Sequence, residues 1–187
     1  MNIDKPGETM IEKEWSIEDC SGCDFHGTTK LVMGCGNKQN KLVIMGRDPG
    51  RFEESYGIPF VGRSGELLND TLEKAGMKRG DFYVTNVVKC RPKRNKTPET
   101  KIVDNCYTHL ALELKEIDPK LILFLGQDAR RVEERLAALL PNCIMVNAYH
   151  PAAVLRNLSL HAVFVKQMIG VHTIITQMKI TDTPILK

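Results

Sequence analysis

The stretch from Leu42 to Leu68 reads LVIMGRDPGRFEESYGIPFVGRSGELL and decides the fold. Its first four residues, 42–45, form an apolar run that is short enough to be a buried strand. Gly46 and Pro49 then end that strand, because such residues interrupt a ladder and turn the chain. Asp48 is therefore held in the turn at the carboxyl end of a strand, where open α/β sheets collect their ligands.

The second half of this stretch predicts a pocket wall followed by a helix. The turn-forming residues 57–62 leave the aromatic ring of Phe60 between two glycines. Ser64 is the expected N-cap of the helix, and Gly76 is expected to close it. The apolar stripe of this helix consists of Leu67, Leu68, Leu72 and Ala75.

The rest of the chain alternates between strand and helix patterns. Further strands are predicted at 82–88, 121–125 and 143–148. Helices are predicted after Thr97 as N-cap, after Gly126, and over 160–178. This alternation is typical of a parallel sheet covered on both faces, so the fold class is α/β. The segment 31–40 is expected to be a loop that leads into the first strand.

The order of the strands predicts a site. Right-handed crossovers bring the carboxyl ends of parallel strands to one edge of the sheet. The residues that follow the four strands, Asp48, Asn86, Gly126 and His150, should therefore lie along the same edge.

The totals are those of one soluble domain. The chain has 187 residues, of which 42% are hydrophobic and 26% charged, with a formal charge of +3. We expect a single domain over 1–187, with a loose arm at 1–17 and a short tail at 179–187. No apolar run of about 18 residues and no signal peptide is evident, which predicts a cytoplasmic protein.

Six cysteines in a reducing compartment indicate metal or redox chemistry before disulfides. Cys20 and Cys23 form a C-x2-C pair, and Cys90 and Cys106 form a C-x15-C pair. Four thiolates can hold a structural zinc or a [4Fe–4S] cluster, or the residues can be ordinary buried cysteines. Cys35 and Cys143 have no matching partners and are expected to be structural thiols.

Each polar residue at the predicted edge has a functional and a structural interpretation. Asp48 can deprotonate a water, or it can hydrogen-bond its own turn. Asn86 can recognise the amide-like edge of a base, or it can simply form a turn. His150 can donate to an oxygen that gains negative charge, or it can be structural. Phe60 can stack on a flat ligand or belong to the core.

A basic run lies between the second predicted strand and the helix that follows it. Residues 89–96 hold five cations, among them Lys89 and Arg91. Such a run is usually a solvated loop. Its place beside the predicted pocket suits contacts with phosphates, which position nucleic acid without reading its sequence.

Together these motifs resemble the uracil-DNA glycosylases of the iron–sulfur type, called family 4. The resemblance covers about 20–156. It rests on the order and spacing of Cys20-x-x-Cys23, Gly46-x-x-Pro49-Gly50-x-x-Glu53, Gly57-Ile-Pro-Phe-Val-Gly-Arg-Ser-Gly-Glu-Leu-Leu68, Asn86-Val-Val-Lys-Cys-Arg-Pro92, Cys106 and His150-Pro151.

The resemblance implies a three-layer α/β/α fold around a central four-stranded parallel sheet. It also implies a [4Fe–4S] cluster held by Cys20, Cys23, Cys90 and Cys106, with a structural rather than a catalytic role. The implied partner is uracil-containing DNA, and a monomer is the implied state.

The same resemblance implies the roles of the site residues. Phe60 would stack on a flipped-out uracil, Asn86 would pair with its O4/N3 edge, and His150 would face O2. Gly46 and Arg47 would line the base site. Lys89, Arg91, Leu155 and Arg156 would contact the DNA, with Leu155 and Arg156 wedging into the duplex and holding a phosphate.

Residue 47 departs from the family, which has Glu at this position. The sequence places Arg47 there, and Asp48 at the position of the water-activating Asp of the family 1 motif Gly-Gln-Asp-Pro-Tyr. We hypothesise that Asp48 is the catalytic carboxylate and that Arg47 pairs with it or contacts a phosphate. The expected activity is that of a monofunctional glycosylase. The alternative, which Arg47 favours, is a module that binds uracil-containing or single-stranded DNA without cleavage.

Overall fold

The computed structural model describes residues 20, 23–25 and 28–181. The expected arm at 1–17 and the last part of the expected tail lie outside the described residues. The described chain forms a five-stranded sheet in the order β1-β3-β2-β4-β5. Its four parallel strands confirm the predicted sheet: β2 Leu42–Gly46, β3 Tyr83–Asn86, β4 Leu121–Leu125 and β5 Ile144–Ala148.

The fifth strand was not predicted. β1, Cys35–Gly36, pairs antiparallel with β3 at the edge of the sheet, inside the segment expected to be a loop. A strand of two residues is too short to show a hydrophobic period. The sheet is therefore mixed, with one antiparallel edge strand added to a parallel core.

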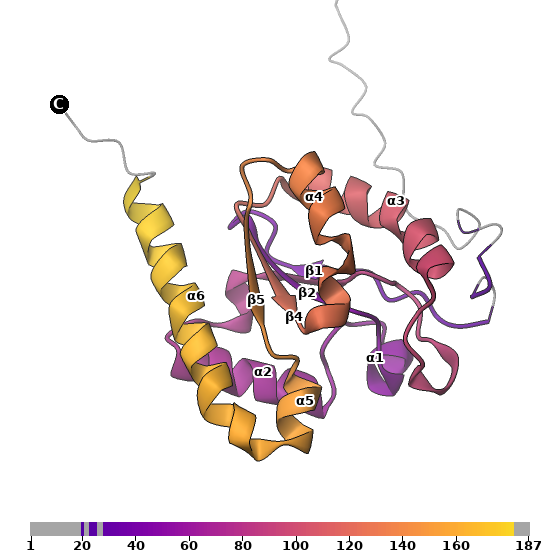
Figure 1. Cartoon of the computed structure of the whole chain (residues 1–187), viewed down its shortest axis with the longest axis horizontal. Helices are drawn as coiled ribbons and strands as arrows, with labels where there is room; N and C mark the ends of the chain where they lie inside the picture. Colours follow the sequence, from indigo (N-terminus) through magenta and orange to yellow (C-terminus); the bar gives the residue numbers. More distant parts are fainter. Residues whose placement is uncertain (1–19, 21–22, 26–27, 182–187) are drawn as a thin grey trace, which may run out of the picture.

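Helices cover both faces of the sheet (Figure 1). On one face, α2, α5 and α6 pack a core that includes Leu68, Leu72, Phe164 and Met168. On the other face, α3 and α4 contribute Leu110, Leu114 and Leu136 to a second core. The helical segments are α1 Arg51–Tyr56, α2 Arg63–Lys74, η2 Arg79–Asp81, η3 Lys93–Asn95, α3 Thr100–Ile117, η4 Gln127–Val132, α4 Glu133–Leu139, α5 Pro151–Arg156, η5 Leu158–Leu160 and α6 His161–Thr181.

Two predicted helix starts were wrong because the expected caps are not used. The N-cap of α2 is Gly62, whose N–H donates to the Glu53 carboxylate over 3.1 Å, and Ser64 lies inside the helix. The N-cap of α3 is Glu99 instead of Thr97, whose hydroxyl accepts from Arg47. The short helices α1 and α5 were not predicted, since six residues do not reveal a helical period.

The last helix, α6, is a core helix over part of its surface. Phe164, Met168, Val171 and Ile175 point into the first core and are at most 5% exposed. By length and composition alone, the segment Leu158–Met178 could also cross a membrane, a weak criterion that core helices of soluble proteins meet as well.

Candidate active site

The carboxyl edge of the parallel strands holds a cavity of about 730 Å³. The four residues that the sequence predicted at this edge, Asp48, Asn86, Gly126 and His150, all line it. The cavity also takes in side chains from the neighbouring turns and short helices. These are Arg47, Pro49, Gly50, Glu53, Phe60, Ser64, Asn95, Leu125, Gln127, Asp128, Tyr149, Ala152, Ala153 and Arg156.

Phe60 is buried in one wall of the cavity. Its ring centroid lies 5.8 Å from that of His150, with the two rings tilted by 33°. Neighbouring glycines make room for it, because a Cβ on Gly46 would come within 2.7 Å of the Phe60 ring and 2.4 Å of Asn86 Oδ1. A side chain at Gly46 would thus push into the space between these two residues.

The backbone of Phe60 is strained, and two charged residues clamp it. Its φ is +54°, in the left-handed region that side chains rarely adopt. Arg79 donates to Phe60 O over 3.2 Å and to Pro59 O over 2.5 Å. On the other side of the loop, Glu53 accepts from the N–H groups of Val61 and Gly62. The strain persists because the surrounding contacts determine the loop.

His150 is held as a neutral donor. It is the N-cap of α5, and its Nδ1 accepts from the N–H of Ala152 over 3.0 Å. The proton of the neutral ring must therefore be on Nε2. Burial, together with the nearby cations Arg47 and Arg156, lowers the pKa of His150 to about 4. The ring stays neutral at physiological pH and offers Nε2–H to the cavity that it lines.

Asn86 ends β3 with its side chain buried, at 2% exposure. No described residue forms a hydrogen bond with its side-chain amide, whereas its backbone carbonyl accepts from Lys89 Nζ. A buried amide has a strong need for partners. The amide lies where a ligand in the cavity can supply both a donor and an acceptor.

Asp48 lies in a chain of three charges. Its carboxylate accepts from Arg47 Nε, and Arg47 Nη1 also donates to Asp128 over 2.9 Å and to Thr97 over 3.2 Å. Burial raises the pKa of Asp48, the Arg47 guanidinium lowers it, and the Asp128 carboxylate raises it. The predicted pairing of Arg47 with Asp48 is therefore present in the structure.

Of the four residues expected to contact DNA, the prediction for Lys89 is wrong. It is 1% exposed and forms an ion pair with Glu113 beneath the sheet edge, so it cannot reach a phosphate. Val87 and Val88, which precede it, are buried as well. Arg91 is partly exposed and donates to Glu54 over 3.0 Å, and Arg156 is exposed at the cavity. Leu155 is half-buried, whereas Leu158 is 75% exposed.

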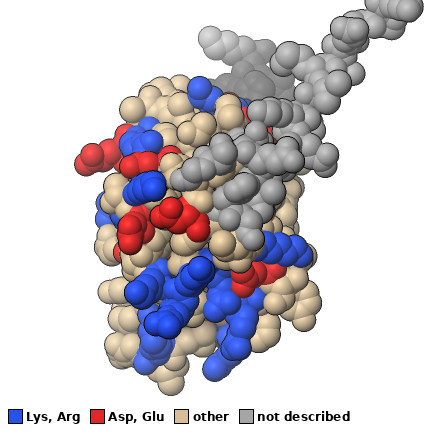
Figure 2. Space-filling view, turned by 90° about the vertical axis from the view of Figure 1, so that its right-hand side faces the viewer, with Lys and Arg blue, Asp and Glu red and all other residues tan. Residues whose placement is uncertain are grey.

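The remaining cations of the basic run face solvent. Lys93, Arg94 and Lys96 are exposed, as is Arg51 at the start of α1. Figure 2 shows Lys and Arg side chains gathered over the lower part of the face that carries α1, on the right of Figure 1. Asn95, within the same run, lines the cavity. A positive surface therefore borders the candidate site.

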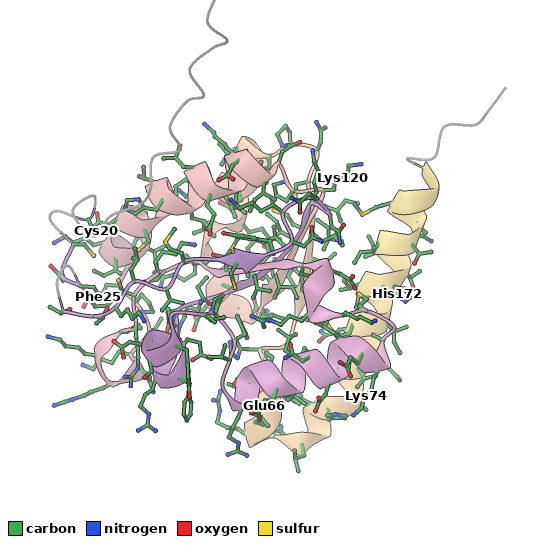
Figure 3. The ribbon with its side chains drawn as sticks, turned by 180° about the vertical axis from the view of Figure 1, so that it is seen from behind. Cys20, Phe25, Glu66, Lys74, Lys120 and His172 are labelled. Atoms are coloured by element: carbon green, nitrogen blue, oxygen red, sulfur yellow. The ribbon has the colours of Figure 1, made fainter. Side chains whose placement is uncertain are left out.

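The four expected cluster ligands lie on one side of the molecule. Cys90 and Cys106 are buried, and Cys20 Sγ lies 3.5 Å from His109 Nε2 of α3. Figure 3 shows Cys20 and Phe25 on the side of the molecule opposite α6, which carries His172. Burial is the main reason that the pKa of Cys106 rises to about 11, with smaller contributions from the neighbouring Cys90 and Cys23.

The donor set fits a thiolate-bound group in its chemistry. Cys23, Cys90 and Cys106 are close enough to one another for their charges to interact. Within the described ranges, however, no three His, Cys, Asp or Glu side chains converge as the ligands of a metal ion. Residues 21–22, between the first two cysteines, lie outside those ranges.

The structure adds site residues that sequence analysis did not single out. Asp128 and Arg79 lie far along the chain from the residues they bind, and no spacing indicates either contact. Glu53 was present in a motif, but only the fold shows that its carboxylate holds the loop of Phe60.

Comparisons with known proteins agree with this geometry. Residues 33–169 match the family model described as the uracil DNA glycosylase superfamily. The crystal structure of Pedobacter heparinus SMUG2 shares the fold, with a TM-score of 0.51 at 12% identity over 86% of this chain and 96% of that one.

Among similar sequences, the type-4 uracil-DNA glycosylase of Archaeoglobus fulgidus is 41% identical over 65% of this chain and 62% of its own length. That of Pyrobaculum aerophilum is 34% identical over 81% of this chain and 87% of its own. That of Thermotoga maritima is 34% identical over 76% and 81%. The chain belongs to the uracil DNA glycosylase superfamily, and within it to the type-4 enzymes.

Proposed function

We propose that this protein is a monofunctional uracil-DNA glycosylase, which hydrolyses the N-glycosidic bond of a flipped-out uracil and leaves an abasic site for base-excision repair. The observation that carries the proposal is the neutral, buried His150, whose only proton is on Nε2, in a cavity shared with Phe60 and Asn86. The names of the type-4 relatives support the same activity.

Base recognition follows from the walls of the cavity. A base inside a duplex is unreachable, so the enzyme must extrude it, at a cost of a few kcal/mol that is smallest for a mismatched base. Phe60 would stack on the extruded ring. The side-chain amide of Asn86, which no described residue bonds, would pair with the O4/N3 edge, which offers one acceptor and one donor.

The chemical step needs a water and a stabilised leaving group. In our proposal Asp48 takes a proton from the water as the water oxygen bonds to the sugar C1′. The bond from C1′ to the base breaks, and its electron pair leaves with the uracil anion. His150 donates Nε2–H to O2 of that anion, and one such donor is worth about 3 kcal/mol in other enzymes.

DNA binding is proposed for the positive surface beside the cavity. Arg91 and Arg156 would contact phosphates, which fix register without reading sequence. Leu155 and Arg156 would enter the space that the extruded base leaves. Leu158 is more exposed than Leu155, so it is the residue against which the wedge role of Leu155 is tested. If Leu158→Ala lowers excision from duplex DNA and Leu155→Ala does not, the wedge is Leu158.

We further propose that Cys20, Cys23, Cys90 and Cys106 hold a [4Fe–4S] cluster, which would order the DNA-facing loops. Iron content and visible absorption test this directly. Cys106→Ser should lose both signals, whereas Cys143→Ser, at a cysteine just before the edge strand β5, should keep them. Retention of iron in Cys106→Ser would contradict the assignment. We also propose a cytoplasmic monomer as the working form.

A second candidate function rests on Arg47. Its guanidinium pairs with the carboxylate that would activate water, so the chain could bind uracil-containing or single-stranded DNA without cleaving it. The ion pair with Asp128 shares the charge of Arg47 and therefore weakens its hold on Asp48. For this reason we favour the enzyme.

Alkali cleavage of an end-labelled oligonucleotide that carries one uracil separates the two functions. The protein is assayed with its iron–sulfur cluster loaded. A monofunctional glycosylase produces a strand break at the uracil only after alkali treatment. A break before alkali would indicate lyase activity. Retention of the uracil strand in a gel shift without any break would indicate the binding module.

A further inference from the structure

Lys89 is a buried cation whose donors are all used. Its side chain is 1% exposed, and Nζ donates to Thr85 Oγ1 over 2.6 Å, to Asn86 O over 2.9 Å and to Glu113 Oε2 over 2.5 Å. An ammonium has three protons, so each finds an acceptor. One of the three acceptors belongs to the backbone of the residue that faces the base site.

Glu113 anchors this cation from α3. Its side chain is 4% exposed, and Oε1 accepts from Tyr83 OH over 2.8 Å and from Gly34 N–H over 3.2 Å. The hydroxyl of Thr85 also donates to the carboxylate. The ion pair therefore ties α3 to β3 and to the residues just before β1.

The ion pair is poorly explained as a source of stability. Taking two charges out of water costs free energy that their attraction repays only in part, and apolar replacements of such pairs are often neutral or stabilising. Buried ionic groups are retained in some proteins because they fix one conformation. The conformation that Lys89 fixes is that of the Asn86 carbonyl.

The peptide group after Asn86 is held at both ends. Its N–H, on Val87, donates to Gly46 O of β2 over 2.9 Å, and its carbonyl accepts from Lys89. The side-chain amide of Asn86 has no hydrogen-bond partner among the described residues, so only the backbone and the packing around Gly46 aim it. Releasing the carbonyl would let this peptide group tilt and move the amide with it.

We propose that Lys89 and Glu113 are positioning residues that hold Asn86 in the conformation its amide needs to recognise the base. The inference rests on the proposed glycosylase function. Neither residue touches the substrate, and both act through Asn86.

A double-mutant cycle tests this role. Lys89→Met with Glu113→Gln removes both charges together and leaves a carbonyl oxygen for Tyr83 and Gly34, while the bond to Asn86 O is lost. Single-turnover excision of uracil is measured with this pair in the parent and in an Asn86→Ala background. We expect the double substitution to lower the excision rate of the parent at least about tenfold, because small misplacements of site groups are costly. In the Asn86→Ala background, where no amide is left to position, it should lower the rate less than about twofold.

An exposed ion pair to the same helix, α3, is the matched control. Lys38 pairs with Glu116 one turn along α3, with both side chains about half exposed. Lys38→Met with Glu116→Gln should leave the rate unchanged, because this pair does not contact Asn86. Iron content and thermal unfolding identify variants that have lost the fold.

If the buried swap does not fold, Thr85→Val removes one acceptor of Lys89 Nζ without changing a charge and should show the same dependence on Asn86. Equal slowing in both backgrounds would show a merely structural role and overturn the inference. A parent that excises no uracil would overturn the glycosylase function and this inference with it. Full activity in Asn86→Ala would show that Asn86 is not needed for base recognition. It would overturn this inference but leave the glycosylase function standing.

Discussion

The backbone N–H of Ala152 donates a 3.0 Å hydrogen bond to Nδ1 of His150, which leaves Nε2 as the protonated nitrogen of a neutral ring. The same peptide group that begins α5 thus selects the tautomer. Because the imidazole enters the cavity as a donor without a charge, it can bind an oxygen that becomes negative during the reaction.

This arrangement predicts a pH dependence of stability. The pKa of His150 is lowered from 6.5 to about 4 in the folded chain, so between these values the unfolded chain binds more protons. The stabilisation is complete above pH 6.5 and is lost as the pH falls toward 4, by about 3 kcal/mol. His150→Asn should lack this component. Urea unfolding of both proteins from pH 7.5 to 4.5 measures it as a changing difference, and a constant difference would contradict the buried, neutral ring.

The charge chain through Arg47 predicts shifts of opposite sign. Arg47 lowers the pKa of Asp48, so Arg47→Ala should raise that pKa further and move the acidic limb of the pH–rate profile to higher pH. Asp128 raises the pKa of Asp48, so Asp128→Asn should move the limb to lower pH. Single-turnover rates across pH measure both.

The two variants control for each other, since each removes one charge from the same chain. Shifts in the same direction would mean that Asp48 does not set the limb. Asp48→Asn completes the set, and we expect it to slow excision about 100-fold or more, as the loss of a general base does. A rate within a few-fold of the parent would exclude Asp48 as the base.

The sequence was sufficient to predict which residues lie at the carboxyl edge of the sheet, but not which side chains from other elements bind them. Asp48, Asn86 and His150 could be placed together because parallel strands end at one edge and each residue follows a strand. Arg79 and Asp128 could not, since their contacts depend on distances between elements that no periodicity encodes. The prediction that Lys89 contacts DNA was wrong for a related reason. Within a run of five cations, only the tertiary structure shows which one turns inward to Glu113.

The space between Phe60 and Asn86 predicts an effect of a single methyl group. A Cβ on Gly46 would lie 2.4 Å from Asn86 Oδ1 and 2.7 Å from the Phe60 ring, so Gly46→Ala must displace both residues. We expect excision to slow about 100-fold, because a misplacement of about 1 Å can cost that much. Gly80→Ala is the control, since nothing lies within 4 Å of its Cβ. Equal rates for the two variants would show that the base does not occupy this space.

The clamp on Phe60 predicts a coupled loss of stability and activity. Arg79→Met keeps most of the apolar stem but removes the donors to Pro59 O and Phe60 O. Hydrogen bonds from a charged group are worth about 1.5–3 kcal/mol, so we expect the free energy of unfolding to fall by about that amount. Relief of the +54° φ of Phe60 would then let its ring leave the cavity.

Chemical denaturation and single-turnover kinetics on the same samples measure both effects of Arg79→Met. Arg63→Met is the matched control, because Arg63 begins α2 on the other side of the loop and is exposed. It should change the stability by less than about 0.5 kcal/mol. If Arg79→Met destabilises the chain while excision at saturating enzyme keeps its parental rate, Phe60 holds its conformation without the clamp. A fall in both quantities, absent in Arg63→Met, would show that the strained backbone of Phe60 is maintained for the base that it receives.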